Sequence, residues 1–275
     1  MMRCICDPFL ACGLRRSLKN GSRGGLRCLK WRRYSKLDVK LSDYTTARVG
    51  LGITGESLST EALLDFRLAH ARARDAVHFP LNAEALAGEM AACGWPALVL
   101  RSAAANRAEY LRNPNKGRRL SEESAKMVAG SGSTAIIIAD GLSALAVHRH
   151  AIPLLKEFAP DAQHSFWIVQ QGRVAVGDQI GEILRADLSI VILGERPGLS
   201  TPDSLGIYLT WSPRVGRSDA ERNCISNIHR HGLSYAEAAH KLAFLVNEAR
   251  KRRLTGVALK EMAGTLIGAT GSQGI

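Results

Sequence analysis

Residues 134–140 read Thr-Ala-Ile-Ile-Ile-Ala-Asp, an apolar, β-branched run that ends in a carboxylate. Such a run predicts a strand that is buried on both faces, as in a parallel sheet. Residues 166–170 and 188–193 repeat this pattern, and helical patterns over residues 143–158 and 178–185 separate the three runs. Strands that alternate with helices predict an α/β protein with a Rossmann-like, doubly wound and mainly parallel sheet.

Weaker patterns extend the prediction on both sides of this centre. Toward the C-terminus, we expect a strand over residues 207–211 and a long amphipathic helix over residues 235–251. The N-terminal part is predicted to be mainly helical. Its expected elements are a helix capped by Ser59 or Thr60 with an apolar stripe of Leu63, Leu64, Phe66, Leu68 and Ala71, a helix over 83–92 capped by Asn82, and a short strand over 97–101.

The chain carries a formal net charge of +12, which raises the possibility of a nucleic-acid partner. Residues 1–44 hold eleven Lys and Arg against three Asp, so this segment accounts for +8. Because the rest is nearly balanced, we expect no nucleic acid on the folded part. We therefore expect three regions: a disordered basic extension (1–44), a mainly helical N-terminal region (45–120) and a Rossmann-like domain (121–275).

The six cysteines and the hydropathy exclude further classes of protein. Four cysteines lie in the extension, and Cys4-x-Cys6 is too closely spaced for a zinc-binding pair, so no metal site is predicted. Cys93 and Cys224 are too few for a disulfide framework, which indicates a reducing compartment. No apolar run reaches the roughly 18 to 20 residues that a membrane helix needs, so a membrane-spanning protein is excluded.

Two candidate motifs fail when their context is considered. Residues 50–55 match G-x-G-x-x-G, the dinucleotide-binding pattern, but no strand pattern precedes them and the helix begins several residues later. We therefore expect a loop there. Cys224, His229 and His231 include metal-ligating residue types, but a second ligand pair at known spacing is missing.

Ligands of doubly wound sheets bind at the carboxyl ends of the strands. These ends are predicted at residues 140–143, 171–174 and 194–198. The last segment, Gly194-Glu-Arg-Pro-Gly198, leaves a buried strand and combines an acid, a base, a rigid Pro and two Gly that allow close approach of a ligand. This composition favours a ligand-binding loop over a plain turn.

Several dispersed motifs together resemble the small (light) subunit of ethanolamine ammonia-lyase. They are Thr45-Thr-Ala-Arg-Val-Gly50, Leu63-Leu-x-Phe66, Arg118-Arg-Leu120, Asp140-Gly-Leu-Ser143, Asp178-Gln-Ile-Gly-Glu-Ile-Leu184, Gly194-Glu-Arg-Pro-Gly-Leu199, Tyr208, Ser212-Pro-Arg214 and Arg222-Asn-Cys-Ile-Ser-Asn-Ile-His229. The resemblance covers about residues 45–260 and leaves out the basic extension.

The resemblance implies a subunit of an adenosylcobalamin-dependent lyase. Such a subunit packs on a large, barrel-shaped subunit in a hetero-oligomer, with the cobalamin between the two. The large subunit holds ethanolamine and the catalytic residues, and radical chemistry releases acetaldehyde and ammonia. Carried over by motif, the cobalamin contacts of this chain are Val174, Glu195 and Cys224. The implied location is the cytoplasm or a bacterial microcompartment. The alternative from the residues alone is a stand-alone cobalamin- or nucleic-acid-binding module that uses the basic extension.

Overall fold

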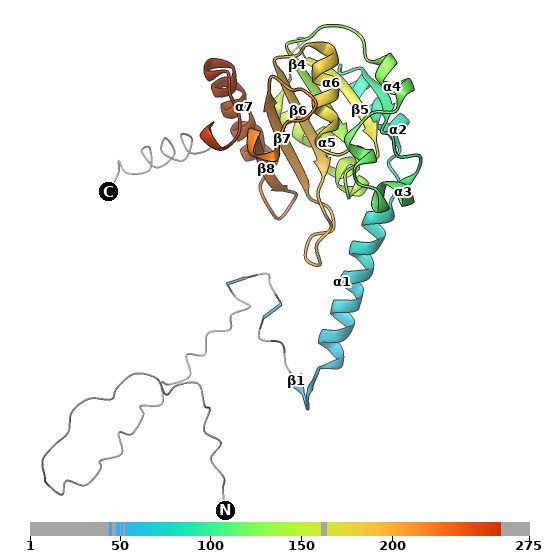
Figure 1. Ribbon diagram of the computed structural model, residues 1–275. Coiled ribbons are helices and arrows are strands. Elements are labelled where there is room, and N and C mark those ends of the chain that lie inside the picture. Colours follow the sequence, from blue (N-terminus) through green and yellow to red (C-terminus); the bar gives the residue numbers. More distant parts are fainter. Residues whose placement is uncertain (1–43, 46–47, 50, 52, 161–163, 260–275) are drawn as a thin grey trace, which may run out of the picture.

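The computed structural model describes residues 44–45, 48–49, 51, 53–160 and 164–259 (Figure 1). Its centre is a six-stranded sheet with the strand order β3-β5-β4-β6-β7-β8. The strands are β3 (Ala97–Arg101), β4 (Thr134–Ala139), β5 (His164–Gln170), β6 (Leu188–Gly194), β7 (Leu205–Trp211) and β8 (Arg222–Ile228). Strands β3, β5, β4 and β6 pair in parallel. Strands β7 and β8 are each antiparallel to the strands beside them. The predicted α/β class and mainly parallel sheet are confirmed.

Helices cover both faces of this sheet. One face packs on α2 (Ala83–Ala92), α5 (Ala144–Phe158) and α7 (Tyr235–Arg252), and the other packs on α4 (Glu122–Met127) and α6 (Val176–Leu184). Successive residues of β4 point to opposite faces, so Ile136 and Ile138 enter the first core and Ile137 enters the second. All three are fully buried, which explains why this strand is apolar throughout.

Local signals place most of the helices correctly. Asn82 and Ser143 cap α2 and α5 by accepting hydrogen bonds from Ala85 N and Ala146 N, respectively. Helix α3 (Arg107–Arg112) and the 3-10 helices η2 (Lys116–Arg118) and η3 (Asp219–Glu221) lie in the connections. The side-chain caps of α2 and α5 satisfy backbone N–H groups that the first helical turn leaves free. No helix in the described ranges has the length and apolarity to cross a membrane.

Helix α1 (Thr60–His78) extends away from the sheet and carries a small hairpin of β1 (Ile53–Thr54) and β2 (Ser57–Leu58) at its outer end (Figure 1). Of the two candidate caps, Ser59 is the one that caps α1. Gly55, the last glycine of the G-x-G-x-x-G match, has φ +65° and lies in the turn of the hairpin. Where a loop was expected, the described end of the match thus enters a short hairpin, and α1 begins five residues after Gly55.

The structure also contains elements that the sequence patterns did not predict. Strand β8 is one of them, because polar and apolar residues are mixed in its sequence, Arg-Asn-Cys-Ile-Ser-Asn-Ile. Helix α4 is another, because it is only six residues long. Strand β7 runs antiparallel to β6 because the connection between them contains no crossover helix.

The predicted division into regions stays a prediction. Residues 1–43 of the basic extension lie outside the described residues, as do Cys4, Cys6, Cys12 and Cys28. Strand β3, from the region expected to be mainly helical, pairs with β5 inside the sheet. Helix α2 from the same region shares a core with α5 and α7. Residues 45–120 thus supply part of the same sheet and core as residues 121–259.

Candidate functional site

The chain reverses its direction of winding at β4. Strand β5 follows on one side of β4, and β6 then follows on the other side. At such a point the loops after neighbouring strands separate, and ligands bind in the crevice between them. The structure has a hollow of about 450 Å³ at this place. Its lining residues are Tyr110, Gly141, Leu142, Arg173, Val174, Leu193, Gly194, Glu195, Arg196 and Tyr208.

The floor of this hollow is built by backbone packed on backbone. Leu142 N donates a hydrogen bond to Gly194 O over 2.9 Å, which joins the loop after β4 to the end of β6. A Cβ atom on Gly194 would lie 2.0 Å from Ser143 O, and one on Gly141 would lie 2.3 Å from Gly194 O. Gly141 also has φ +53°, which side chains rarely adopt. Only glycine at both positions allows these two loops to meet.

Val174 and Glu195, two of the three predicted cobalamin contacts, lie together in the hollow. Val174 follows β5 and Glu195 follows β6. The Glu195 carboxylate is held in place, because its Oε2 accepts a hydrogen bond from Asn227 N over 3.1 Å. Within the described part of the chain, no hydrogen bond to Glu195 Oε1 is present. Glu195 therefore offers a fixed acceptor at the hollow.

Cys224, the third predicted contact, lies beside the hollow and not in its lining. It is an exposed cysteine on β8 and pairs in register with Tyr208 on β7. Tyr208 itself lines the hollow and hydrogen-bonds the Cys224 side chain. Burial of Tyr208, and then its contact with Cys224, raise the pKa of the phenol. Tyr208 consequently stays neutral and connects Cys224 to the wall that Val174 and Glu195 form.

Two further residues line the wall: Tyr110, which was not predicted, and Arg173, which lies in the predicted segment 171–174 but was not singled out. Tyr110 Oη donates to Gly172 O over 3.3 Å, and burial raises its pKa to about 12. The Arg173 guanidinium lies 5.4 Å from the centre of the Tyr110 ring, and its buried Nε has no hydrogen-bond partner within the described ranges. Arg173 adjoins the predicted Val174, whereas a single aromatic residue in a short helix carries no sequence signal.

Asp140 connects two of the strand ends that form the wall. Its Oδ1 accepts a hydrogen bond from Gly172 N over 3.0 Å, which joins the end of β4 to the turn that precedes Val174. Burial raises the pKa of Asp140 to about 6, against the opposing effect of the Arg107 charge. The Asp140 carboxyl thus loses its proton near pH 6, whereas an ordinary aspartate loses its proton near pH 4.

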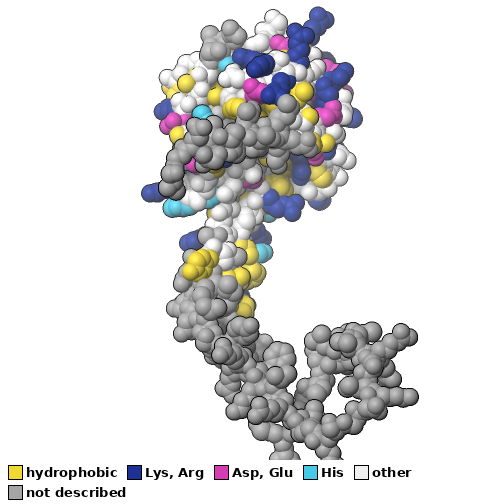
Figure 2. Space-filling view, turned by 90° about the vertical axis from the view of Figure 1, so that its left-hand side faces the viewer, with side chains coloured by type: hydrophobic (Ala, Val, Ile, Leu, Met, Phe, Trp, Pro, Cys, Tyr) yellow, Lys and Arg dark blue, Asp and Glu magenta, His cyan; other side chains and the backbone are white. Residues whose placement is uncertain are grey.

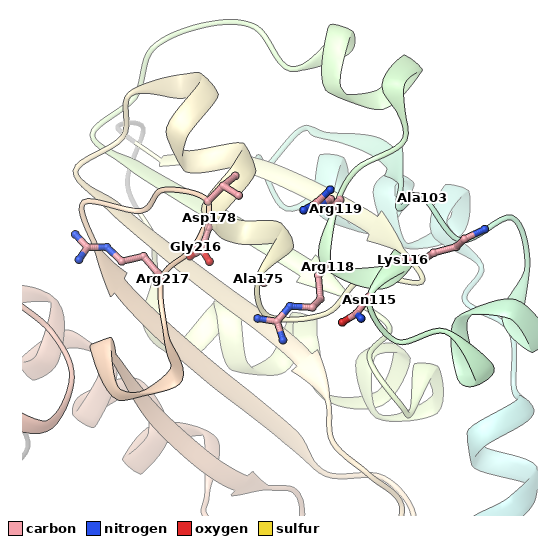
Figure 3. A pocket seen from close by; sticks show the side chains of 10 residues that line it. Ala103, Asn115, Lys116, Arg118, Arg119, Ala175, Asp178, Gly216 and Arg217 are labelled. Carbon is pink, nitrogen blue, oxygen red and sulfur yellow. The ribbon is translucent and has the colours of Figure 1, made fainter.

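A second hollow of about 580 Å³ lies at the start of α6 and is lined by several Lys and Arg side chains (Figure 3). Lys116 and Arg217 extend away from its centre and are paired with Glu109 and Glu221, respectively. The Arg118 side chain turns toward Ala175. The first N–H groups of α6 are already bonded to carbonyls of residues 173–175. This basic recess holds none of the predicted site residues.

His229 and His231, which follow Cys224 in the sequence, form local hydrogen bonds. His229 Nε2 lies 3.0 Å from Asn227 Oδ1, and His231 N donates to His229 Nδ1 over 3.3 Å. Among the residues that the structure describes, no three His, Cys, Asp or Glu side chains are grouped to hold a metal ion.

Comparison with known proteins identifies the family. Residues 37–260 match the ethanolamine ammonia-lyase light chain (EutC) family. The chain is 50% identical over 238 residues to the ethanolamine ammonia-lyase small subunit of Pseudomonas syringae pathovar tomato, which covers 82% of this chain and 83% of that protein. The small subunit of Pseudomonas putida is 51% identical, with 82% and 88% covered. Because a family match over most of the chain and relatives at half identity agree, this chain belongs to the ethanolamine ammonia-lyase light chain family.

Proposed function

We propose that this chain is the small subunit of an adenosylcobalamin-dependent ethanolamine ammonia-lyase and forms one wall of the cobalamin site. The observation that supports the wall is the meeting of Val174 and Glu195 from different strand ends in one hollow at the point where the winding reverses. The names of the relatives support the lyase activity, in which ethanolamine is converted to acetaldehyde and ammonia. In this proposal the sheet holds its ligand in the Rossmann-like manner.

The residues of the hollow fit the chemistry of a corrin, whose rim carries amide side chains. Glu195 Oε1 can accept a hydrogen bond from an amide N–H, and the unpaired Nε of Arg173 can donate one to an amide oxygen. Val174 and the ring of Tyr208 supply apolar contact, and Cys224 lies behind Tyr208. Gly141 and Gly194 keep the floor free of side chains. When bound, adenosylcobalamin supplies the radical chemistry, while the protein positions and shields it.

The proposed division of work places the catalytic residues on a large subunit. In this proposal the other side of the cofactor is covered by the partner in a hetero-oligomer. Of the titratable groups near the wall, the phenols of Tyr110 and Tyr208 are neutral and Asp140 is paired with Arg107, so none of these three is a free base. We further infer that the complex works in the cytoplasm or in a bacterial microcompartment, without a nucleic-acid partner.

The test uses Glu195 in the assembled complex. This chain, with Glu195→Ala or Glu195→Gln, is co-expressed with a large subunit, and binding of adenosylcobalamin is titrated by its visible absorbance. A hydrogen bond to a charged group contributes about 1.5–3 kcal/mol, so we expect Glu195→Ala to raise Kd about 10- to 100-fold. Glu195→Gln keeps an acceptor and should have a smaller effect.

Glu157→Gln is the matched control, because Glu157 is exposed in the last turn of α5, at the opposite end of the sheet. Circular dichroism of each variant checks that the chain is folded. The proposed wall is wrong if Glu195→Ala binds adenosylcobalamin as tightly as the unchanged complex does. The proposed activity is wrong if the unchanged complex releases no acetaldehyde from ethanolamine with the cofactor present.

A further inference from the structure

The outer part of the projecting helix exposes an unusual amount of apolar surface. We call residues 53–68, the β1–β2 hairpin and the first half of α1, the arm. Five of the fourteen large hydrophobic side chains that the described residues expose lie in it: Leu58, Leu63, Leu64, Phe66 and Leu68. Figure 2 shows hydrophobic side chains gathered on this stem below the body of the molecule. Apolar groups concentrated in this way mark an interaction site.

The four of these side chains that belong to α1 lie on two sides of the helix. Leu64 and Leu68 are one turn apart and share one side, with 58% and 50% of their surface exposed. Leu63 and Phe66 are three residues apart and share another side. A helix that is apolar on more than one side is typical of an element that is enclosed by other protein. A single flat contact would leave one of the two pairs in water.

The arm also lacks the packing that normally stabilises a helix. Only Ala69 and Ala76 are buried among the 19 residues of α1, and both lie beyond the arm. Helices in water gain most of their stability from tertiary packing of an apolar face and little from intrinsic propensity. Within the described residues, the first half of α1 has little of this packing. A partner that covers the arm would supply it.

The position of the arm indicates which partner this is. A hollow of about 530 Å³ is lined both by α1, including Leu68, and by Leu199 and Pro202. These two residues belong to the loop that starts at Glu195 in the proposed cobalamin wall. The surface is thus continuous from the wall, through this loop, to the arm. The protein that closes the cobalamin site from the other side would reach the arm along this surface.

We propose that the arm inserts into an apolar groove of the large subunit, which contacts both the Leu64–Leu68 side and the Leu63–Phe66 side. This inference rests on the proposed function, because it takes the large subunit as the protein facing the wall. The arm lies within residues 37–260, the part that matches the light chain family, so a partner common to that family is the fitting occupant. The arm then anchors the small subunit, and the wall contacts the cofactor.

The test measures association of the full chain with the large subunit in two double variants. Leu64→Gln with Leu68→Gln removes one side, and Leu63→Gln with Phe66→Gln removes the other. Glutamine retains a good helix propensity, so α1 is preserved. We expect each pair to raise the Kd between the subunits at least about 10-fold, since buried anchor side chains at interfaces commonly contribute that much. Circular dichroism verifies the helix content.

The matched control is Met127→Gln with Ile183→Gln. Both side chains are apolar and exposed, by 48% and 40%, but they lie on α4 and α6, away from the arm. This pair should leave the Kd unchanged. The proposal is overturned if both arm variants associate like the unchanged chain, or if only one side matters. It is also overturned if light scattering finds the isolated chain to be a dimer that the arm variants dissociate, because a second copy is then the occupant.

Titrations with and without adenosylcobalamin separate this proposal from the proposed function. If the unchanged chain binds the large subunit but arm variants do not differ, the arm proposal fails and the proposed function stands. If the unchanged chain does not bind a large subunit at all, the proposed function fails first. A weakened association that is the same in the absence of cofactor supports the arm as an anchor independent of the cobalamin wall.

Discussion

Arg107 joins the base of α1 to the wall through Asp140. The Arg107 Nη1 atom lies 3.3 Å from Asp140 Oδ2 and donates to Gly141 O over 2.8 Å, while its Nε donates to Val77 O over 2.8 Å. The other oxygen of Asp140 accepts from Gly172 N. One ion pair therefore holds together the last turn of α1, the end of β4 and the turn after β5. This geometry connects the projecting helix to the proposed site.

Asp140 should make stability depend on pH. The pKa of Asp140 is raised from 3.8 to about 6, so between these values the folded chain retains a proton that the unfolded chain has lost. Stability from this group is therefore fully present below pH 4 and is lost as the pH rises through 6. Two pKa units correspond to about 3 kcal/mol.

We expect the free energy of unfolding of the unchanged chain to fall relative to Asp140→Asn by up to about 3 kcal/mol between pH 4 and 7. Urea unfolding across this range measures the difference. Other carboxyls titrate equally in both proteins and cancel. Parallel curves for the two proteins would contradict the assigned shift of Asp140.

Gly194 should not tolerate a side chain. A Cβ atom there would lie 2.0 Å from Ser143 O and 2.8 Å from Asp140 O, and both are backbone atoms that cannot turn aside. We expect Gly194→Ala to lower the free energy of unfolding by about 3 kcal/mol. Gly88→Ala is the matched control, because the space around Gly88 in α2 is open and alanine there should stabilise the helix by about 0.5–1 kcal/mol. Equal effects in urea unfolding would refute the close packing of the two loops.

The buried pair of Arg222 and Asp178 should be costly to break. Arg222 Nη1 and Nη2 lie 2.6 and 2.7 Å from the two Asp178 oxygens, and Nη1 also donates to Thr210 Oγ1 over 3.0 Å. Because both side chains are only 2% exposed, Arg222→Met leaves a buried carboxylate unpaired and should lower the free energy of unfolding by about 3–5 kcal/mol. Lysine cannot form the two-pronged contact, so Arg222→Lys should recover only part of this loss. Unfolding of Arg222→Lys at the same urea concentration as the unchanged chain would contradict this account.

The part of the basic extension before residue 37 should be dispensable for the lyase. The family match begins at residue 37, eight residues before the resemblance noted in the sequence. Removing residues 1–36 should therefore leave acetaldehyde release by the assembled complex unchanged. Loss of activity at normal expression would disprove this. Filter binding to DNA at several salt concentrations tests the nucleic-acid alternative, which requires a steep salt dependence that disappears with residues 1–36.

Much of the candidate site could be located from strand ends alone. Val174 and Glu195 each follow an apolar run, and parallel strands bring such positions to one edge. Tyr110 could not be found this way, because it reaches the hollow from a connection that folds back over Gly172. Cys224 required β8, whose mixed pattern reflects a strand with an exposed face. Its distance from the hollow depends on the register with Tyr208, which no local pattern encodes.

Elements with local signals can be recognised from the amino-acid sequence alone. The helix caps Ser59, Asn82 and Ser143 act within three residues, and the buried strands are recognised from their own composition. What each element packs against, by contrast, depends on contacts between residues that are distant in the sequence. The apolar side chains of α1 predicted a helix correctly, yet they lie outside the core of this chain. Hydrophobic periodicity shows that a face is to be covered, but burial depends on long-range contacts, and for the arm we place those contacts in another subunit.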